Sequence, residues 1–135
     1  MDEVILNKAA ITERCLRRIR SLQGQTDEQD PYLYEDALLL NLERACQAAI
    51  DLAMHVVSSR HLGVPQSRAE AFRLLEQAEV IPGALAQNLA KMVGFCNRMV
   101  HSYQDVDSQQ VDRSVAAALR DLPEFCKAMG ARISL

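Results

Sequence analysis

The feature that most constrains the fold is a long apolar segment, from about Tyr32 to Arg60, in which hydrophobic side chains point in nearly every direction around a helix. These side chains are Leu38, Leu39, Leu40, Leu42, Ala45, Cys46, Ala48, Ala49, Ile50, Leu52, Ala53, Val56 and Val57. A helix that is apolar nearly all round is central in a bundle or shared between subunits. We therefore expect it to be the main pillar of an all-α bundle and a contact in a dimer.

Helical periodicity predicts four further helices, which gives a bundle of about five. Their expected ranges are about 2–22, a short helix after a capping box at Ser67 and Glu70, about 84–102, and a last helix that begins after Asp107 or Ser108 and stops at Gly130. The third helix is expected to turn Phe72, Leu75 and Ala78 inward. Pro123 is expected to kink or break the last helix near Leu122.

Composition supports a single domain over residues 1–135, large enough for a proper core. Apolar residues make up 49% of the chain, yet aromatic residues make up only 4% and Trp is absent, which suits a helical bundle. The net charge of −3 disfavours a passive nucleic-acid binder but leaves room for an enzyme with a local basic patch.

The four cysteines, Cys15, Cys46, Cys96 and Cys126, have no metal-binding spacing, so no metal site is expected. No leader-like segment opens the chain, and no apolar run reaches the length of a membrane span. Reduced thiols and a cytoplasmic location without membrane contact follow as expectations.

Two further polar groups of the sequence have ordinary explanations. Asp51 and His55 lie one turn apart and are expected to form a local pair more readily than a catalytic one. The arginines of the first helix, Arg14, Arg17, Arg18 and Arg20, are expected to form a solvated basic face, although they could meet phosphates.

Polar side chains gather at the end of the fourth predicted helix, in Cys96-Asn97-Arg98-Met99-Val100-His101-Ser102-Tyr103. At about 100° per residue, Asn97 and Arg98 lie within about 60° of His101. Cys96 instead belongs to an apolar stripe of core spacing, formed by Leu85, Leu89, Met92, Cys96 and Val100. An amide, a guanidinium and an imidazole are thus predicted on one face.

The segment from Gly94 to Tyr103 resembles the signature of the HepT-like HEPN ribonuclease toxins, which carry Arg, a polar residue, a short spacer, His, one residue and Tyr. The segment from Leu40 to Ala53 resembles the long second helix of that family, and the resemblance extends over most of the chain. It implies a HEPN-type bundle and a homodimer that brings two motifs together. It also implies that a small nucleotidyltransferase antitoxin silences the toxin by attaching AMP to the motif tyrosine.

The resemblance matches His101 to the catalytic histidine, Asn97 to the polar residue of the motif and Tyr103 to the modified tyrosine, and it places Cys96 where the family has its catalytic arginine. Metal-independent RNA cleavage needs a base for the ribose 2′-hydroxyl, which an imidazole can supply. It also needs a cation for the phosphate, which a guanidinium supplies and a thiol does not. Arg98 lies on the His101 face and is the candidate replacement.

Three functions remain open from the sequence. The first is a ribonuclease toxin in which Arg98 acts beside His101. The second is a catalytically inactive HEPN module that binds a nucleotidyltransferase, a nucleotide or RNA, with Cys96 either a sign of degeneration or a deliberate inactivating change. The third is nucleotide binding by Lys91, Arg98 and His101 as an anion site. No cofactor is expected in any of them.

Overall fold

The computed structural model describes residues 2–25, 30–101 and 107–135, and for Val100 and His101 it describes the backbone alone. Within these residues the chain forms α1 (Glu3–Gln23), α2 (Pro31–Ser59), α3 (Arg68–Gln77), α4 (Gly83–His101) and α5 (Ser108–Ala128). The predicted all-α bundle and the expected helix ranges are therefore confirmed to within a few residues.

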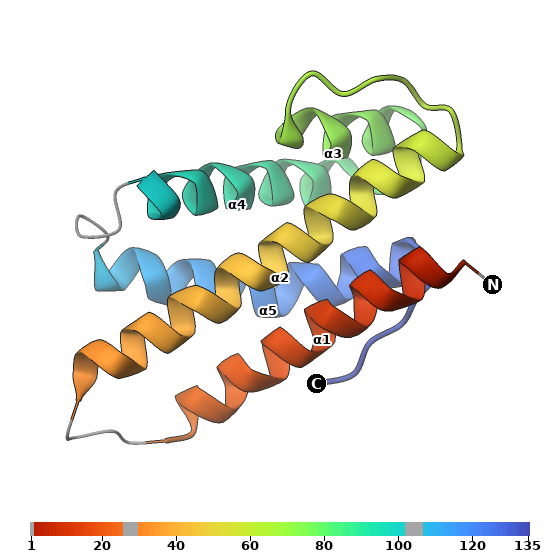
Figure 1. Cartoon of the computed structure of the whole chain (residues 1–135). Helices are drawn as coiled ribbons and strands as arrows, with labels where there is room; N and C mark the ends of the chain where they lie inside the picture. The colour runs from red at the N-terminus through yellow and green to blue at the C-terminus, as the bar shows by residue number, and fades with distance from the viewer. Residues whose placement is uncertain (1, 26–29, 102–106) are drawn as a thin grey trace.

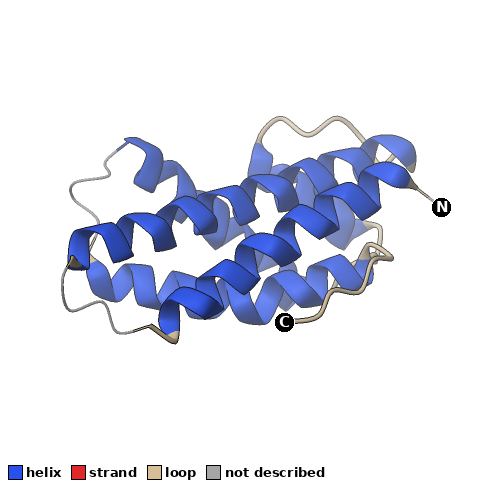
Figure 2. Cartoon of the chain, turned by 60° about the horizontal axis from the view of Figure 1, so that its bottom comes forward, coloured by secondary structure: helices blue, strands red, loops and turns tan. Residues whose placement is uncertain are grey.

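The long α2 crosses the molecule and contacts each of the other four helices (Figure 1). Its buried side chains extend from Leu38 to Val57, because residues on all sides of this helix are apolar. The view in Figure 2, turned by 60°, shows the same elongated bundle with α1 and α2 lying side by side. The predicted role of this segment as the central pillar is confirmed.

Local sequence signals set the helix ends. Asp2 caps α1, Asp107 caps α5, and Ser67 caps α3 by accepting the backbone N–H of Glu70 at 3.2 Å. Glu70 returns the interaction by accepting the backbone N–H of Gln66 at 3.1 Å, so the predicted pairing of Ser67 with Glu70 at this end is confirmed.

One local expectation is wrong, and a second is wrong in part. Ala78 is exposed, because α3 ends at Gln77 and Ala78 is its C-terminal cap rather than part of its buried face. The expected break near Leu122 does not occur, because α5 continues through Pro123 to Ala128, and the alternative of a kink stays a prediction. Burial of Leu122, Phe125 and Cys126 on both sides of the proline holds this segment helical despite the lost N–H.

The C-terminal segment returns to α1 after Gly130, whose φ of +100° lies in the region that glycine adopts easily. The backbone N–H of Ser134 donates to Glu13 at 2.9 Å, and Arg17 Nε donates to the Ser134 carbonyl at 3.0 Å. The C-terminal segment is therefore fastened along α1, the helix that begins the chain (Figure 1).

Candidate functional site

The polar motif lies at the C-terminal end of α4. Leu85, Leu89, Met92 and Cys96 are all buried, so the predicted apolar stripe holds α4 against the bundle, with Val100 outside the described side chains. Asn97 and Arg98 are exposed on the other side of the helix, as the sequence predicted.

Arg98 turns its side chain back along α4, toward the start of the helix. Its guanidinium carbon lies 6.0 Å from the centre of the Phe95 ring. A Cβ added at Gly94 would lie 3.7 Å from Arg98 Nη1, so the guanidinium passes over the glycine. This is an ordinary contact distance, so the position of Arg98 does not depend on a glycine at position 94.

The rest of the motif lies largely outside the described residues. The backbone of α4 reaches His101, which sets the register of this residue on the helix, but the side chain of His101 and all of Ser102 and Tyr103 are not described. The roles of His101 and Tyr103 therefore stay predictions.

Cys96 faces the interior of the bundle and is only 5% exposed. Its thiol lies beside that of Cys46 on α2, and this interaction together with burial raises the pKa of the Cys46 thiol. The position that the resemblance gives to an arginine is therefore occupied here by one member of a buried thiol pair.

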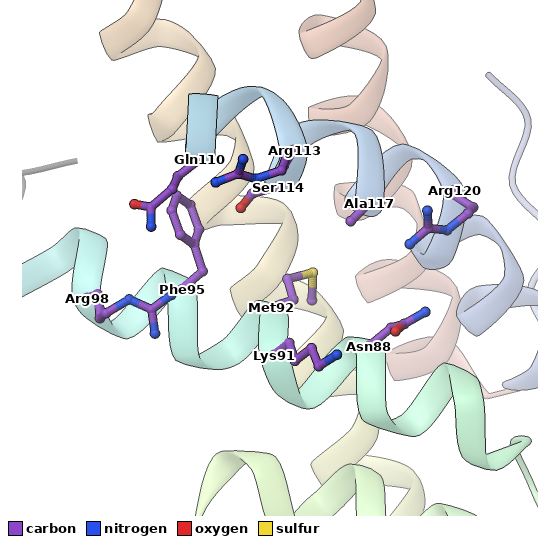
Figure 3. Close-up of a pocket in the computed structure, with 10 residues that line it drawn as sticks. All are labelled: Asn88, Lys91, Met92, Phe95, Arg98, Gln110, Arg113, Ser114, Ala117 and Arg120. Carbon is purple, nitrogen blue, oxygen red and sulfur yellow. The ribbon is translucent and has the colours of Figure 1, made fainter. Parts of the chain in front are cut away.

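A basic groove runs between α4 and α5 beside Arg98 (Figure 3). It has a volume of about 310 Å³ and is lined by Asn88, Lys91, Met92, Phe95, Arg98, Gln110, Arg113, Ser114, Ala117 and Arg120. None of these residues is acidic. We call it the α4–α5 groove.

Sequence reasoning identified Lys91 and Arg98 but gave no role to Arg113 and Arg120. The two arginines lie seven residues apart and so share one face of α5, and this basic face could have been predicted from their spacing. Nothing in the sequence, however, indicated that this face lies opposite Lys91 and Arg98.

The expected pair of Asp51 and His55 is not formed. His55 Nε2 instead contacts Asp2 Oδ2 at 2.7 Å, and Asp51 forms an ion pair with Lys8 at 3.2 Å. Asp51 and His55 both contact residues of α1 or its N-terminal cap. Because α1 and α2 lie side by side, α1 offers closer partners than the next turn of α2 does. The hydrogen bond from His55 lowers the pKa of the Asp2 carboxyl.

Within the described residues, no three His, Cys, Asp or Glu side chains converge on a point where they could hold a metal ion. In the same part of the chain no helix has the length and apolar character needed to span a membrane. The first-helix arginines Arg14, Arg17, Arg18 and Arg20 are exposed, and Arg17 pairs with Glu13 at 3.7 Å.

Comparison with known proteins decides the family. The model of the family described as "Ribonuclease HepT-like" matches residues 12–129. The chain belongs to the HepT-like ribonuclease family. The resemblance seen in the sequence is thereby confirmed. The buried thiol pair and the α4–α5 groove described above are features of this particular HepT-like chain.

Named relatives of this HepT-like chain are nucleases. The mRNA nuclease HepT of Shewanella oneidensis is 38% identical over 126 residues, which are 93% of this chain and 95% of the relative. The tRNA nuclease HepT of Aphanizomenon flos-aquae is 33% identical over 102 residues, which are 73% of this chain and 69% of the relative.

A solved complex has the same fold. The tri-AMPylated HEPN toxin of Shewanella oneidensis, in complex with its MNT antitoxin, matches this HepT-like chain with a TM-score of 0.87 and 38% identity. The match covers 96% of this chain and 98% of that toxin. The HEPN-type five-helix bundle predicted from the sequence is thus confirmed.

Proposed function

We propose that this HepT-like protein is the toxin of a toxin–antitoxin pair, a cytoplasmic homodimer that cleaves RNA without a metal ion. The observation that carries the proposal is the 38% identity to an mRNA nuclease HepT over 93% of the chain. The exposed guanidinium of Arg98, one turn before His101 on α4, supports it chemically.

In the proposed reaction His101 takes the proton from the ribose 2′-hydroxyl. The 2′-oxygen then bonds to phosphorus as the bond to the 5′-oxygen breaks, and the departing oxygen takes up a proton from solvent. Arg98 holds the phosphate oxygens as negative charge builds on them. Asn97, on the same exposed side of α4, is proposed to hydrogen-bond the substrate beside Arg98.

The deciding experiment measures cleavage of a mixed RNA in EDTA by the parent protein, His101→Ala, Arg98→Gln and Cys96→Arg. We expect the parent to cut, and each of the first two variants to lose roughly 10²–10³ in rate. Arg73→Gln, on the exposed face of α3, removes one charge away from the site and should cut as the parent does. Cutting that disappears with EDTA, or that survives in His101→Ala, would contradict the proposal.

Neutralisation is proposed to follow the family pattern, with a nucleotidyltransferase antitoxin that attaches AMP to Tyr103. A solved relative is tri-AMPylated in complex with its MNT antitoxin, which supports this part of the proposal. Added phosphates would repel the RNA backbone from the site. Mass spectrometry after incubation with the antitoxin and ATP should find AMP on the parent and none on Tyr103→Phe.

The second candidate is a catalytically inactive HEPN module, and the burial of Cys96 against Cys46 favours it. An arginine at position 96 would have to enter a packed interface, so we expect Cys96→Arg to lower the free energy of unfolding by about 1–3 kcal/mol. Cutting only by a folded Cys96→Arg protein would establish this second candidate for the parent chain.

A further inference from the structure

The α4–α5 groove concentrates positive charge on a protein whose net charge is −3. Four of its ten lining residues are cations, namely Lys91, Arg98, Arg113 and Arg120. Two come from each helix, so the charge is gathered by the packing of α4 on α5 rather than by a run in the sequence (Figure 3).

Three of these cations form no ion pair with any residue that the structure describes. Among the described residues, Lys91, Arg98 and Arg113 form no ion pair, whereas Arg120 is held by Asp121 through two hydrogen bonds of 3.0 and 3.1 Å. Like charges gathered in one groove repel each other, and a bound anion relieves that repulsion. The groove is therefore built to take an anion.

The groove continues toward the start of α4 into a second hollow, which shares Asn88 and Arg120 with it. That second hollow carries Asp121 and Glu124 together with Arg120 and Lys127, so its acidic and basic side chains are equal in number. Among the described residues, cations that form no ion pair therefore lie along the groove, whereas the charges of the second hollow balance. The excess of positive charge is thus confined to the α4–α5 groove, which is the part that favours an anionic chain.

The length and lining of the groove suit a strand rather than a single ion. Lys91 and Arg98 are separated by two helical turns, about 10 Å, as are Arg113 and Arg120. Asn88, Gln110 and Ser114 add neutral hydrogen-bonding groups to the lining, suited to ribose hydroxyls and base edges.

We propose that the α4–α5 groove binds the phosphodiester backbone of single-stranded RNA next to the bond to be cut. This proposal rests on the proposed function for the position of the cut, at Arg98 and His101. Lys91 and Arg113 hold phosphates of the flanking nucleotides and position the strand, whereas Arg98 contacts the reacting phosphate. Such contacts depend on charge, which gives affinity with little sequence preference.

The test measures binding of a short fluorescein-labelled 2′-O-methyl RNA by fluorescence anisotropy over a range of salt concentrations. The methylated 2′-oxygen has no proton to give up, so this probe is bound without being cut. The variants are Lys91→Gln, Arg113→Gln and the double variant, with Arg73→Gln on α3 as the matched control. All three side chains are exposed, so folding should be unchanged, which circular dichroism checks.

We expect each groove variant to weaken binding roughly 10-fold at low salt. The slope of log K against log salt should become shallower by about 0.7 for each cation removed. Arg73→Gln should bind as the parent does. Equal binding by the parent and all of its variants, or no binding by the parent, would overturn the groove proposal.

Cleavage measured on the same proteins separates this proposal from the proposed function. Binding that depends on Lys91 and Arg113, without cleavage by the parent, would keep the groove and reject the nuclease. Cleavage at the parental rate by the groove variants would keep the nuclease and reject the groove. Unchanged RNA binding, combined with lost binding of the nucleotidyltransferase antitoxin, would assign the groove to that protein and overturn our proposal.

Discussion

At the scale of single residues, the carboxylate of Asp2 caps α1 and also contacts His55 on α2. Asp2 Oδ1 accepts the backbone N–H groups of Val4 and Ile5 at 2.9 and 3.3 Å, while Oδ2 contacts His55 Nε2 on α2. The cap of α1 is thus tied to the pillar helix, and the arrangement depends on a charged Asp2.

The first prediction concerns pH. Because the folded protein lowers the pKa of Asp2 below its ordinary value of 3.8, the stabilisation is present above that pH and is lost as the pH falls through the lower folded value. Asp2→Asn should therefore be less stable than the parent at about pH 6, with the difference shrinking toward about pH 3. Urea unfolding at several pH values measures this, and an unchanging difference would contradict it.

At the scale of the helices, α3 and α5 meet through two aromatic rings. Phe72 and Phe125 are both fully buried, with ring centroids 5.4 Å apart and an angle of 71° between the ring planes. Edge-to-face pairs of this kind add to the stabilisation that burial alone supplies. The short α3 is marginal by itself and packs mainly on α4 and α2, and the ring contact adds a link to α5.

The second prediction follows from this pair. Phe125→Ala should lower the free energy of unfolding by about 3–5 kcal/mol, because it leaves a cavity in the core. The effect of the double variant Phe72→Ala with Phe125→Ala should differ from the sum of the two single effects by about 0.5–1.5 kcal/mol, which is the coupling between the rings. Tyr32→Ala, at a side chain that is 80% exposed, is the control and should change stability by less than about 0.5 kcal/mol. Urea unfolding of the four variants measures these differences, and additive effects of the two phenylalanine substitutions would contradict the coupling.

The sequence predicted the helices well because apolar periodicity and capping residues act locally. The buried stripe through Leu89 and Cys96, and the cap at Ser67, could be read from neighbouring residues. The contact of Cys96 with Cys46, and the approach of Arg113 to the α4 cations, depend on how helices pack together. Spacing along one helix holds no information about which face of another helix lies opposite.

At the scale of the whole molecule, all four cysteines lie inside the bundle. Cys15, Cys46, Cys96 and Cys126 are free thiols with at most 5% exposure. Burial raises the pKa of the Cys126 thiol to about 12, and it raises the pKa of Cys15 as well. The thiolate is the reactive form, so reaction requires the fold to open.

The third prediction is that a thiol reagent will report this opening. At about pH 8 the native protein should react slowly with Ellman's reagent, and all four thiols should react quickly in denaturant. Cys96→Ser should remove one thiol from the count in denaturant and leave native labelling slow. A thiol that reacts at once in the native protein would contradict the burial of these side chains.

The pairing of Cys96 with Cys46 also has an evolutionary consequence. Cysteine and arginine codons can differ by one base, so mutation alone would readily interchange the two residues at position 96. Packing opposes that exchange, because the space beside Cys46 fits a thiol and not a guanidinium. Positions 46 and 96 should therefore change together among relatives, with a smaller or more polar residue on α2 wherever arginine occupies the α4 position.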